Sequence, residues 1–218
     1  MSQIKLLHSG GNGVSIVAPD SNPASDRTLK LPSDGDGTIL TTNSSVGKIL
    51  QVISNVKSDN ASWTGTSFVD IAGTDEAGNG SIWEVNITPT AANSKILFEF
   101  SGAMGSNLGV MMALRLVREI NDSSAAYPFL GDSGGVRPQV SRHVRDDQTD
   151  MKVHAIHQSH FTFLDSPSYS VGDTLTYKIQ VASKYSSREI CINRTSNGSD
   201  QTYTLCGTST ITLEEVAA

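Results

Sequence analysis

The stretch 209–216, STITLEEV, decides the fold class. Ile211 and Leu213 fall on one side of an extended chain, and Thr210 and Thr212 fall on the other. This period of two, with β-branched residues on both sides, is typical of a β-strand. We expect the segment to be the last strand of a sheet, ending at a sheet edge or at a subunit contact.

The composition extends this expectation to the whole chain of 218 residues. Hydrophobic residues make up 37%, charged residues 17% and aromatic residues 6%, while turn-forming Gly, Ser, Thr, Asn and Asp are abundant. Such a composition favours short strands and tight turns over long helices. The length suits one main core, either alone or with a small accessory module.

Further strand candidates, each bounded by turn signals, follow one another along the chain. They are SFVDIA (67–72), SIWEVNI (81–87), SKILFEFSG (94–102), VMMALRLVREI (110–120), MKVHAIHQSHFTFL (151–164), DTLTYKIQVAS (173–183) and REICINRT (188–195). The segment 110–120 also fits a helix, but its neighbours are all strands and no N-cap precedes it, so we favour a strand. Eight or more strands predict an all-β, two-sheet sandwich.

The N-terminal part differs from the rest in having only short strands and many turns. Residues 1–45 are predicted to form a small β module, 46–66 a linker and first strand, and 67–218 the sandwich domain. The module is too small to build a core in one copy, so it needs partners, most simply copies of itself.

Both parts of the chain carry motifs of one family. The stretch GGNGVSIVAPDSNPASDRTLKLPSDGDGTILTT (10–42) resembles a module of bacteriophage tail fibres, especially those of marine phages that infect cyanobacteria. The segments TSFVDIAG (66–73), SKILFEFSG, YKIQVAS (177–183) and STITLEEVA resemble the jelly-roll appendage domain of the same proteins. The resemblance covers nearly the whole chain.

The resemblance implies a homotrimer with a jelly roll like that of tumour necrosis factor, located in a virion that is assembled in the host cytoplasm. The N-terminal module would dock on other virion proteins, and the jelly roll would attach to the host surface, for example to a glycan. The brevity of the chain also fits a second possibility, a capsid decoration or head-fibre protein.

The long polar excursion 121–150 is the candidate receptor-binding region, because binding usually falls on such loops. Its candidate residues are Arg137, Arg142, His143, Arg145, Asp146 and Asp147. Trp63 and Trp83 would suit stacking on sugars if they were exposed, although tryptophans more often fill a core.

No enzyme is expected. GDSGG (131–135) matches the nucleophile loop of trypsin-like proteases. However, the only His before Ser133 is His8, which lacks the flanking sequence and has no room before it for barrel strands, so we interpret the motif as a turn. A glycan depolymerase remains an alternative, although no carboxylate pair stands out. His154, His157 and His160 cannot reach one metal from a single strand, and SDGDG (33–37) lacks the later ligands of a calcium loop. We therefore expect no catalytic residue, cofactor or metal.

Charge and hydropathy exclude two further classes of partner. The net charge is −6 and basic residues are scattered, so nucleic acid is not expected. No apolar run is long enough for a membrane span or the core of a signal peptide, so we expect a soluble protein made in the cytoplasm.

Cys191 and Cys206 lie equally far from the turn-rich residues 197–199. A hairpin that turned there would place the two cysteines on facing strands and would allow a disulfide. Two free thiols, as a reducing cytosol would keep them, are the alternative.

Overall fold

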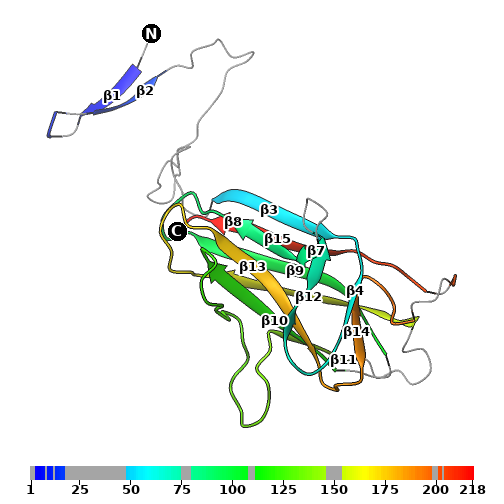
Figure 1. Cartoon of the computed structure of the whole chain (residues 1–218). Helices are drawn as coiled ribbons and strands as arrows, with labels where there is room; N and C mark the ends of the chain where they lie inside the picture. Colours follow the sequence, from blue (N-terminus) through cyan, green and yellow to red (C-terminus); the bar gives the residue numbers. More distant parts are fainter. Residues whose placement is uncertain are drawn as a thin grey trace, which may run out of the picture. The chain divides into compact units, whose positions relative to one another are not determined.

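The computed structural model describes residues 3–7, 9–11, 13–17, 48–74, 80–107, 111–145, 154–197, 201–202 and 204–218. The chain divides into two compact units, Met1–Asn43 and Ser44–Ala218 (Figure 1). In the first unit, β1 (Gln3–Leu7) and β2 (Gly13–Val17) form an antiparallel pair. The other strands expected before residue 43 lie outside the described residues.

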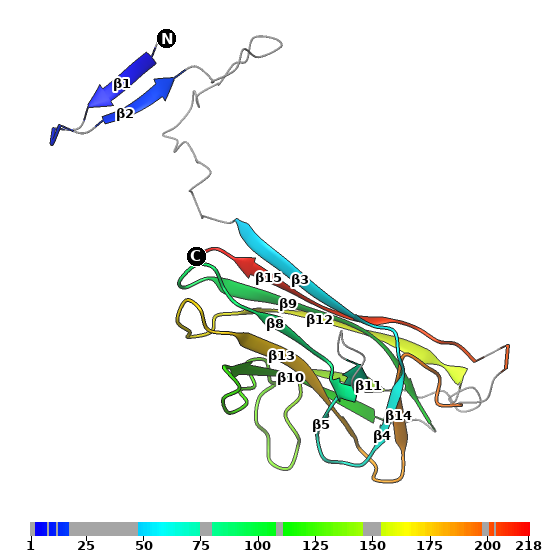
Figure 2. The same cartoon turned by 45° about the horizontal axis from the view of Figure 1, so that its top comes forward.

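The second unit contains two antiparallel sheets that pack face to face (Figure 2). The six-stranded sheet consists of β3 (Ile49–Lys57), β15 (Ser209–Val216), β9 (Lys95–Ser106), β12 (Ile156–Asp165), β14 (Glu189–Ile192) and β4 (Ala61–Thr64). The five-stranded sheet consists of β11 (Arg142–Arg145), β10 (Met111–Ile120), β13 (Leu175–Ser183), β8 (Glu84–Ile87) and β5 (Val69–Asp70). A short ribbon of β6 (Ala72–Thr74) and β7 (Gly80–Ile82) lies between β5 and β8 in sequence. The described residues contain no α-helix, which confirms the all-β expectation.

The strand pairs of this sandwich are nested. β3 pairs with β15, β8 with β13, β9 with β12, and β10 with β11. Along these eight strands, the first therefore pairs with the last, the second with the seventh, and so on inward. A long hairpin rolled up in this way is a jelly roll, so the expected jelly-roll sandwich is confirmed.

The strand 209–216 lies inside its sheet, because β15 pairs with β3 on one side and with β9 on the other. Ile211 and Leu213 face the core and are fully buried, as their spacing predicted. Of the two expected positions, the sheet edge is wrong, because β15 has a neighbouring strand on each side from Thr210 to Val216. The subunit contact stays a prediction.

Within the segment 110–120, the described residues Met111–Ile120 form a strand, β10, as the sequence favoured. Met112, Leu114 and Leu116 alternate into the core and are fully buried. The range 46–66 contains both β3 and β4, and these strands belong to the six-stranded sheet.

Aromatic rings fill the space between the sheets. The Phe161 ring lies 5.7 Å from Phe98 and 5.4 Å from Phe100, and the Phe98 ring lies 6.0 Å from Tyr177. Trp83 is 1% exposed and packs 6.1 Å from Phe100, and Trp63 is half-buried against the same core. Trp83 is therefore a core residue and cannot present its ring to a sugar.

One inward-facing polar cluster joins the two sheets. Asp165, on β12, accepts hydrogen bonds from the Arg118 guanidinium at 2.7 Å and from the Tyr177 hydroxyl at 2.8 Å. Arg118 and Tyr177 belong to the facing sheet. Burial, followed by the charge of Asp165, raises the pKa of Tyr177 well above its usual value, so the hydroxyl keeps its proton.

A second polar cluster lies at the end of β15. The fully buried carboxylate of Glu215 accepts hydrogen bonds from the backbone N–H of Thr90 at 2.9 Å, from that of Ala91 at 3.1 Å, and from the Gln51 amide at 2.8 Å. Burial alone would raise the pKa of Glu215, but these donors outweigh it and the pKa is lowered. Glu215 thereby holds the connection between β8 and β9 against the six-stranded sheet.

Candidate binding groove on the five-stranded sheet

The outer face of the five-stranded sheet is built by alternate residues of β10 and β13, which point away from the core. Across these strands Ala113 lies opposite Ala182, and Arg115 lies opposite Gln180. On its other side Ala113 lies opposite His143 of β11. A face of this kind normally carries polar side chains, so two alanines side by side leave a depression.

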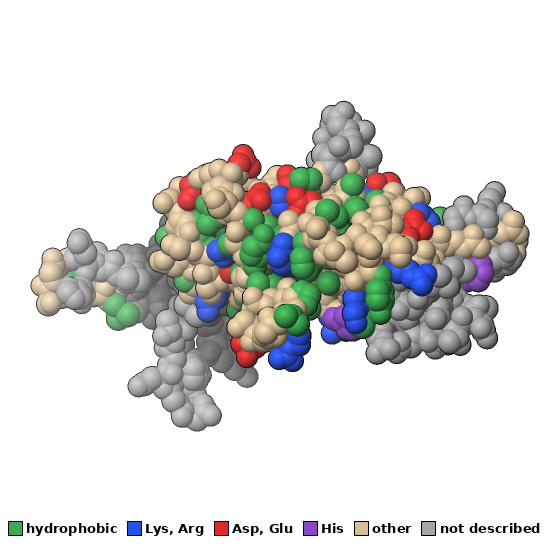
Figure 3. Space-filling view, turned by 60° about the horizontal axis from the view of Figure 1, so that its bottom comes forward, with side chains coloured by type: hydrophobic (Ala, Val, Ile, Leu, Met, Phe, Trp, Pro, Cys, Tyr) green, Lys and Arg blue, Asp and Glu red, His purple; other side chains and the backbone are tan. Residues whose placement is uncertain are grey.

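This depression is part of a groove of about 640 Å³. Its floor and walls are mainly apolar and include Phe68, Met111, Ala113, Val136, Pro138, Val140 and Ala182. Its basic lining residues are Arg137, His143 and Lys184. Figure 3 shows a face of the molecule on which hydrophobic side chains lie between Lys and Arg side chains.

One wall of the groove comes from the excursion that connects β10 to β11. A tight turn forms where the Arg137 backbone N–H donates to the Gly134 carbonyl at 3.2 Å, and Gly135 supplies the positive φ of 60°. The Gln139 side chain and the Gly131 backbone close the base of this turn, because Gln139 donates to the Gly131 carbonyl at 2.8 Å. The last two residues of the motif GDSGG, Gly134 and Gly135, are thus part of a turn, and Gly135 has the positive φ that was expected of a glycine in it.

Ser141 attaches the excursion to the sheet. Its backbone N–H donates to the Leu114 carbonyl at 2.9 Å, and its hydroxyl accepts from the Leu116 N–H at 2.8 Å and donates to the Phe129 carbonyl. The Phe129 ring stacks on Phe163 of the facing sheet at 4.9 Å. The wall is therefore fixed at its base by both backbone bonds and core packing.

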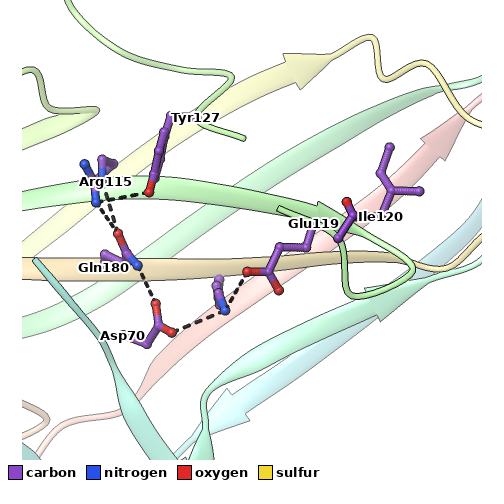
Figure 4. A network of polar contacts seen from close by, with 8 residues as sticks. Asp70, Arg115, Glu119, Ile120, Tyr127 and Gln180 are labelled. Carbon is purple, nitrogen blue, oxygen red and sulfur yellow. Dashed lines mark hydrogen bonds and ion pairs between the residues drawn. The ribbon is translucent and has the colours of Figure 1, made fainter. Parts of the chain in front are cut away.

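Next to the groove, Arg115 is held between two aromatic rings. Its guanidinium carbon lies 4.1 Å from the centre of the Phe68 ring and 4.0 Å from that of Tyr127. The same guanidinium donates to the Gln180 side chain, at 3.1 Å from Nε (Figure 4). These contacts fix the position of Phe68, which also lines the groove.

The polar network continues from Gln180 along the sheet. Gln180 donates to Asp70 at 2.8 Å, and the Lys178 ammonium lies 3.2 Å from Asp70 and 3.0 Å from Glu119 (Figure 4). Burial lowers the pKa of Lys178, but the two carboxylates outweigh it and the pKa is raised. In this part of the face, positive and negative charges are matched.

Among the described residues, no carboxylate matches the basic residues of the groove in this way. Within the described part of the chain, Arg137, His143 and Lys184 form no ion pair, and the polar partner of the Arg137 guanidinium is the Gly134 carbonyl at 3.1 Å. No described lining residue is acidic. The groove therefore joins an apolar floor to a basic rim.

The structure separates the six candidate residues of the excursion. Arg137 and His143 line the groove, and Arg142 is exposed beside them. Arg142–Arg145 form strand β11 rather than a loop, because they pair with β10. Asp146 and Asp147 lie outside the described residues.

Sequence reasoning missed the groove residues outside the excursion, chiefly Phe68, Met111, Ala113, Ala182 and Lys184. A signal was present in β10, where Met111 and Ala113 occupy the positions that alternate with the core residues Met112 and Leu114. Apolar residues on both faces of a strand indicate that something covers the outer face.

The two cysteines are free thiols. Cys191 is buried in β14, opposite Gly105 and Ser62, whereas Cys206 is exposed and forms a bridge with Arg194. The backbone pairing is thus displaced by three residues from the hairpin that would place Cys191 opposite Cys206. Burial, with the nearby Glu189 carboxylate, raises the pKa of Cys191 to about 12, so its thiol is unreactive at neutral pH.

The other chemical motifs form no site within the described residues. His157 and His160 lie on β12 and His154 just before it, and no group of three or more His, Cys, Asp or Glu side chains there could hold a metal. The residues 33–37 lie outside the described part. Among the described residues, no helix long and apolar enough to cross a membrane is found.

The chain was compared with family models, with curated proteins and with solved structures. No protein-family model matches the chain, and no curated protein matches it. Among solved structures it is similar to "Structure of infectious bursal disease virus Gx strain", with 14% sequence identity and a TM-score of 0.32. That match covers 94% of this chain and 46% of the other, so this chain spans less than half of that structure's length. The described residues define a jelly-roll protein with an apolar, basic-rimmed groove.

Proposed function

We propose that this protein is a non-enzymatic virion component, a homotrimeric appendage that attaches to the host surface. The N-terminal module docks on other virion proteins, and the jelly roll is displayed outward. The observation that carries the proposal is the nested strand pairing, which forms a jelly roll. The resemblance of residues 10–42 and of the later strands to phage appendages implies this fold.

The outer face of the six-stranded sheet is a suitable surface for trimer contacts. One row across it consists of Val52, Glu214, Leu97 and Leu164, and another of Val56, Thr210, Ser101 and His160. Val52, Val56 and Leu164 are 57%, 59% and 46% exposed. Exposed aliphatic side chains gathered on one sheet face are typical of a protein–protein contact.

Trimerisation would also serve attachment. Three copies of a weak site on one particle raise the effective concentration for the second and third contacts, and so strengthen binding without any new contact. The groove on the five-stranded sheet lies on the opposite face of the sandwich from the proposed contact and stays accessible in such a trimer.

The oligomeric state is tested by size-exclusion chromatography with light scattering on the full chain. We expect a mass near three times 23.2 kDa for the native protein. The double substitution V52D/V56D should yield monomers, because it places charges in the contact. The control is Val171→Asp, an exposed valine in the turn before β13, which should leave the mass unchanged. A monomeric native protein would contradict the trimer.

The location is tested by immunogold labelling of virions. Label on the tail supports the host-attachment role, and label on the shell shows a capsid decoration protein instead. Absence of label on purified particles contradicts the virion role. Release of reducing ends from host polysaccharide by the purified chain would contradict the non-enzymatic assignment.

A further inference from the structure

We infer that the groove on the five-stranded sheet binds an anionic amphiphile: an apolar segment lies on Ala113 and Ala182, and a carboxylate or phosphate lies at Arg137, His143 and Lys184. The inference deepens the proposed attachment function, on which it rests for its biological setting, by naming the chemical class of the ligand.

The apolar part follows from the floor of the groove. Ala113 lies on it between Ala182 and His143 of the neighbouring strands, and Phe68 and Met111 also line it. The volume of about 640 Å³ lies within the range typical of small-molecule sites, roughly 300–1,000 Å³. A short alkyl chain would cover these side chains and remove them from water, which is favourable in proportion to the area buried.

The anionic part follows from charge complementarity. Farther along the same face, the Lys178 ammonium lies between two carboxylates at 3.2 and 3.0 Å, whereas the basic groove residues have no such partner among the described residues. The chain as a whole carries a charge of −6, so this local excess of positive charge is opposite in sign to the net charge. A ligand with one or two negative charges would balance the charge of the basic groove residues, as Asp70 and Glu119 balance that of Lys178.

The site is largely formed before a ligand arrives. Ser141 fixes one wall through its bonds to Leu114, Leu116 and Phe129, and Arg115 fixes Phe68 by lying against its ring. Binding therefore costs little ordering of the wall or the floor, which improves the affinity of a small ligand.

The inference is tested by isothermal titration calorimetry on the full chain. The probes are dodecanoate and dodecyl phosphate, each below its critical micelle concentration. Dodecyltrimethylammonium, which has the same chain and the opposite charge, and inorganic phosphate, which has no chain, are the controls. We expect binding of one or both anionic amphiphiles and much weaker binding of the two controls. Preference between the two anionic probes distinguishes a fatty-acid source from a phosphorylated-lipid source.

Three variants locate the site. Ala113→Trp fills the groove and should abolish binding, and R137Q and K184Q should each weaken it by about fivefold, as for one exposed ion pair. Arg142→Gln is the matched control, because Arg142 lies on the same strand as His143 and does not line the groove. Near-ultraviolet circular dichroism should show that all four variants keep the native fold.

The inference is overturned if neither anionic probe binds, if the cationic probe binds as well as they do, or if folded A113W binds like the native chain. These results concern the purified protein alone. Virion labelling and trimer mass test the proposed function separately, so a groove without ligand on a labelled, trimeric appendage would overturn only this inference.

Discussion

The two outer faces of the sandwich differ although both are made of antiparallel strands in the same fold. The six-stranded sheet carries mixed rows in which exposed valine and leucine side chains lie beside polar ones, whereas the five-stranded sheet carries a charge network and a groove. The difference comes from the connections, because the excursion between β10 and β11 supplies Val136, Pro138 and Val140 to the wall of the groove. A bare face suits contact with another protein surface, and a face with a loop wall suits a small ligand.

The largest expected effect on the free energy of unfolding comes from the polar cluster that joins the two sheets. Asp165→Asn removes the carboxylate that binds Arg118 and Tyr177 across the sheets, and leaves the charge of Arg118, whose side chain is 16% exposed, without its partner. We expect a loss of about 3–5 kcal/mol in the free energy of unfolding, measured with urea. Tyr177→Phe, which keeps the ion pair, should cost only about 1 kcal/mol. Equal losses for the two variants would show that the ion pair is not the main contribution.

A smaller loss of stability is expected from a substitution at Glu215, which lies in the six-stranded sheet. The folded pKa of Glu215 is lowered, so its contribution to stability is present above the unfolded pKa and disappears as the pH falls through the folded value. Glu215→Gln should cost about 1.5–3 kcal/mol at pH 7, the range for a hydrogen bond to a charged group.

The pH dependence supplies the check on this prediction. Urea unfolding of the native chain and of E215Q, measured from pH 7 down through the acid range, should give a difference that shrinks at low pH. A difference that stays constant with pH would contradict an ionised, stabilising carboxylate at this position.

The smallest loss of stability is expected from a substitution at Arg115, on the outer face of the five-stranded sheet. Arg115→Met removes the cation between Phe68 and Tyr127 while keeping an extended side chain. We expect a loss of about 1–2 kcal/mol, since each exposed cation–π contact contributes about 0.5–1 kcal/mol. The mass in solution should not change. A change in oligomeric state on R115M would show that the two faces are not independent.

The sequence predicted those features that depend on local alternation. The period of two in 209–216 and 110–120 correctly indicated strands, and the resemblance to phage appendages led to the jelly roll. Alternation cannot tell an interior strand from an edge strand when the partner lies far away in sequence, so the position of β15 was missed. Arg118 and Asp165 face inward at positions where a polar residue would normally indicate the outside.

The groove was harder to predict, because its parts come from distant segments. Phe68 precedes β5, Ala182 lies near the end of β13, and Pro138 belongs to the excursion. None of these residues forms a local motif, and their proximity depends on strand register. The hairpin predicted to place Cys191 opposite Cys206 does not form, for a related reason. Asn193 takes a positive φ of 61° and its carbonyl accepts the Gly207 N–H at 2.9 Å, so the backbone after β14 pairs differently from a regular hairpin.

The nested pairing also governs the order in which the protein can fold during synthesis. β15 inserts between β3 and β9, and its residue Ile211 is separated from its hydrogen-bonded neighbour Ser54 by 157 positions. Until the ribosome has made Ser209–Val216, the facing edges of β3 and β9 have no strand between them, and exposed edges invite pairing with other chains. Contacts of such high sequence separation also slow folding. A chaperone that shields these edges on the nascent chain would therefore increase the yield of native protein.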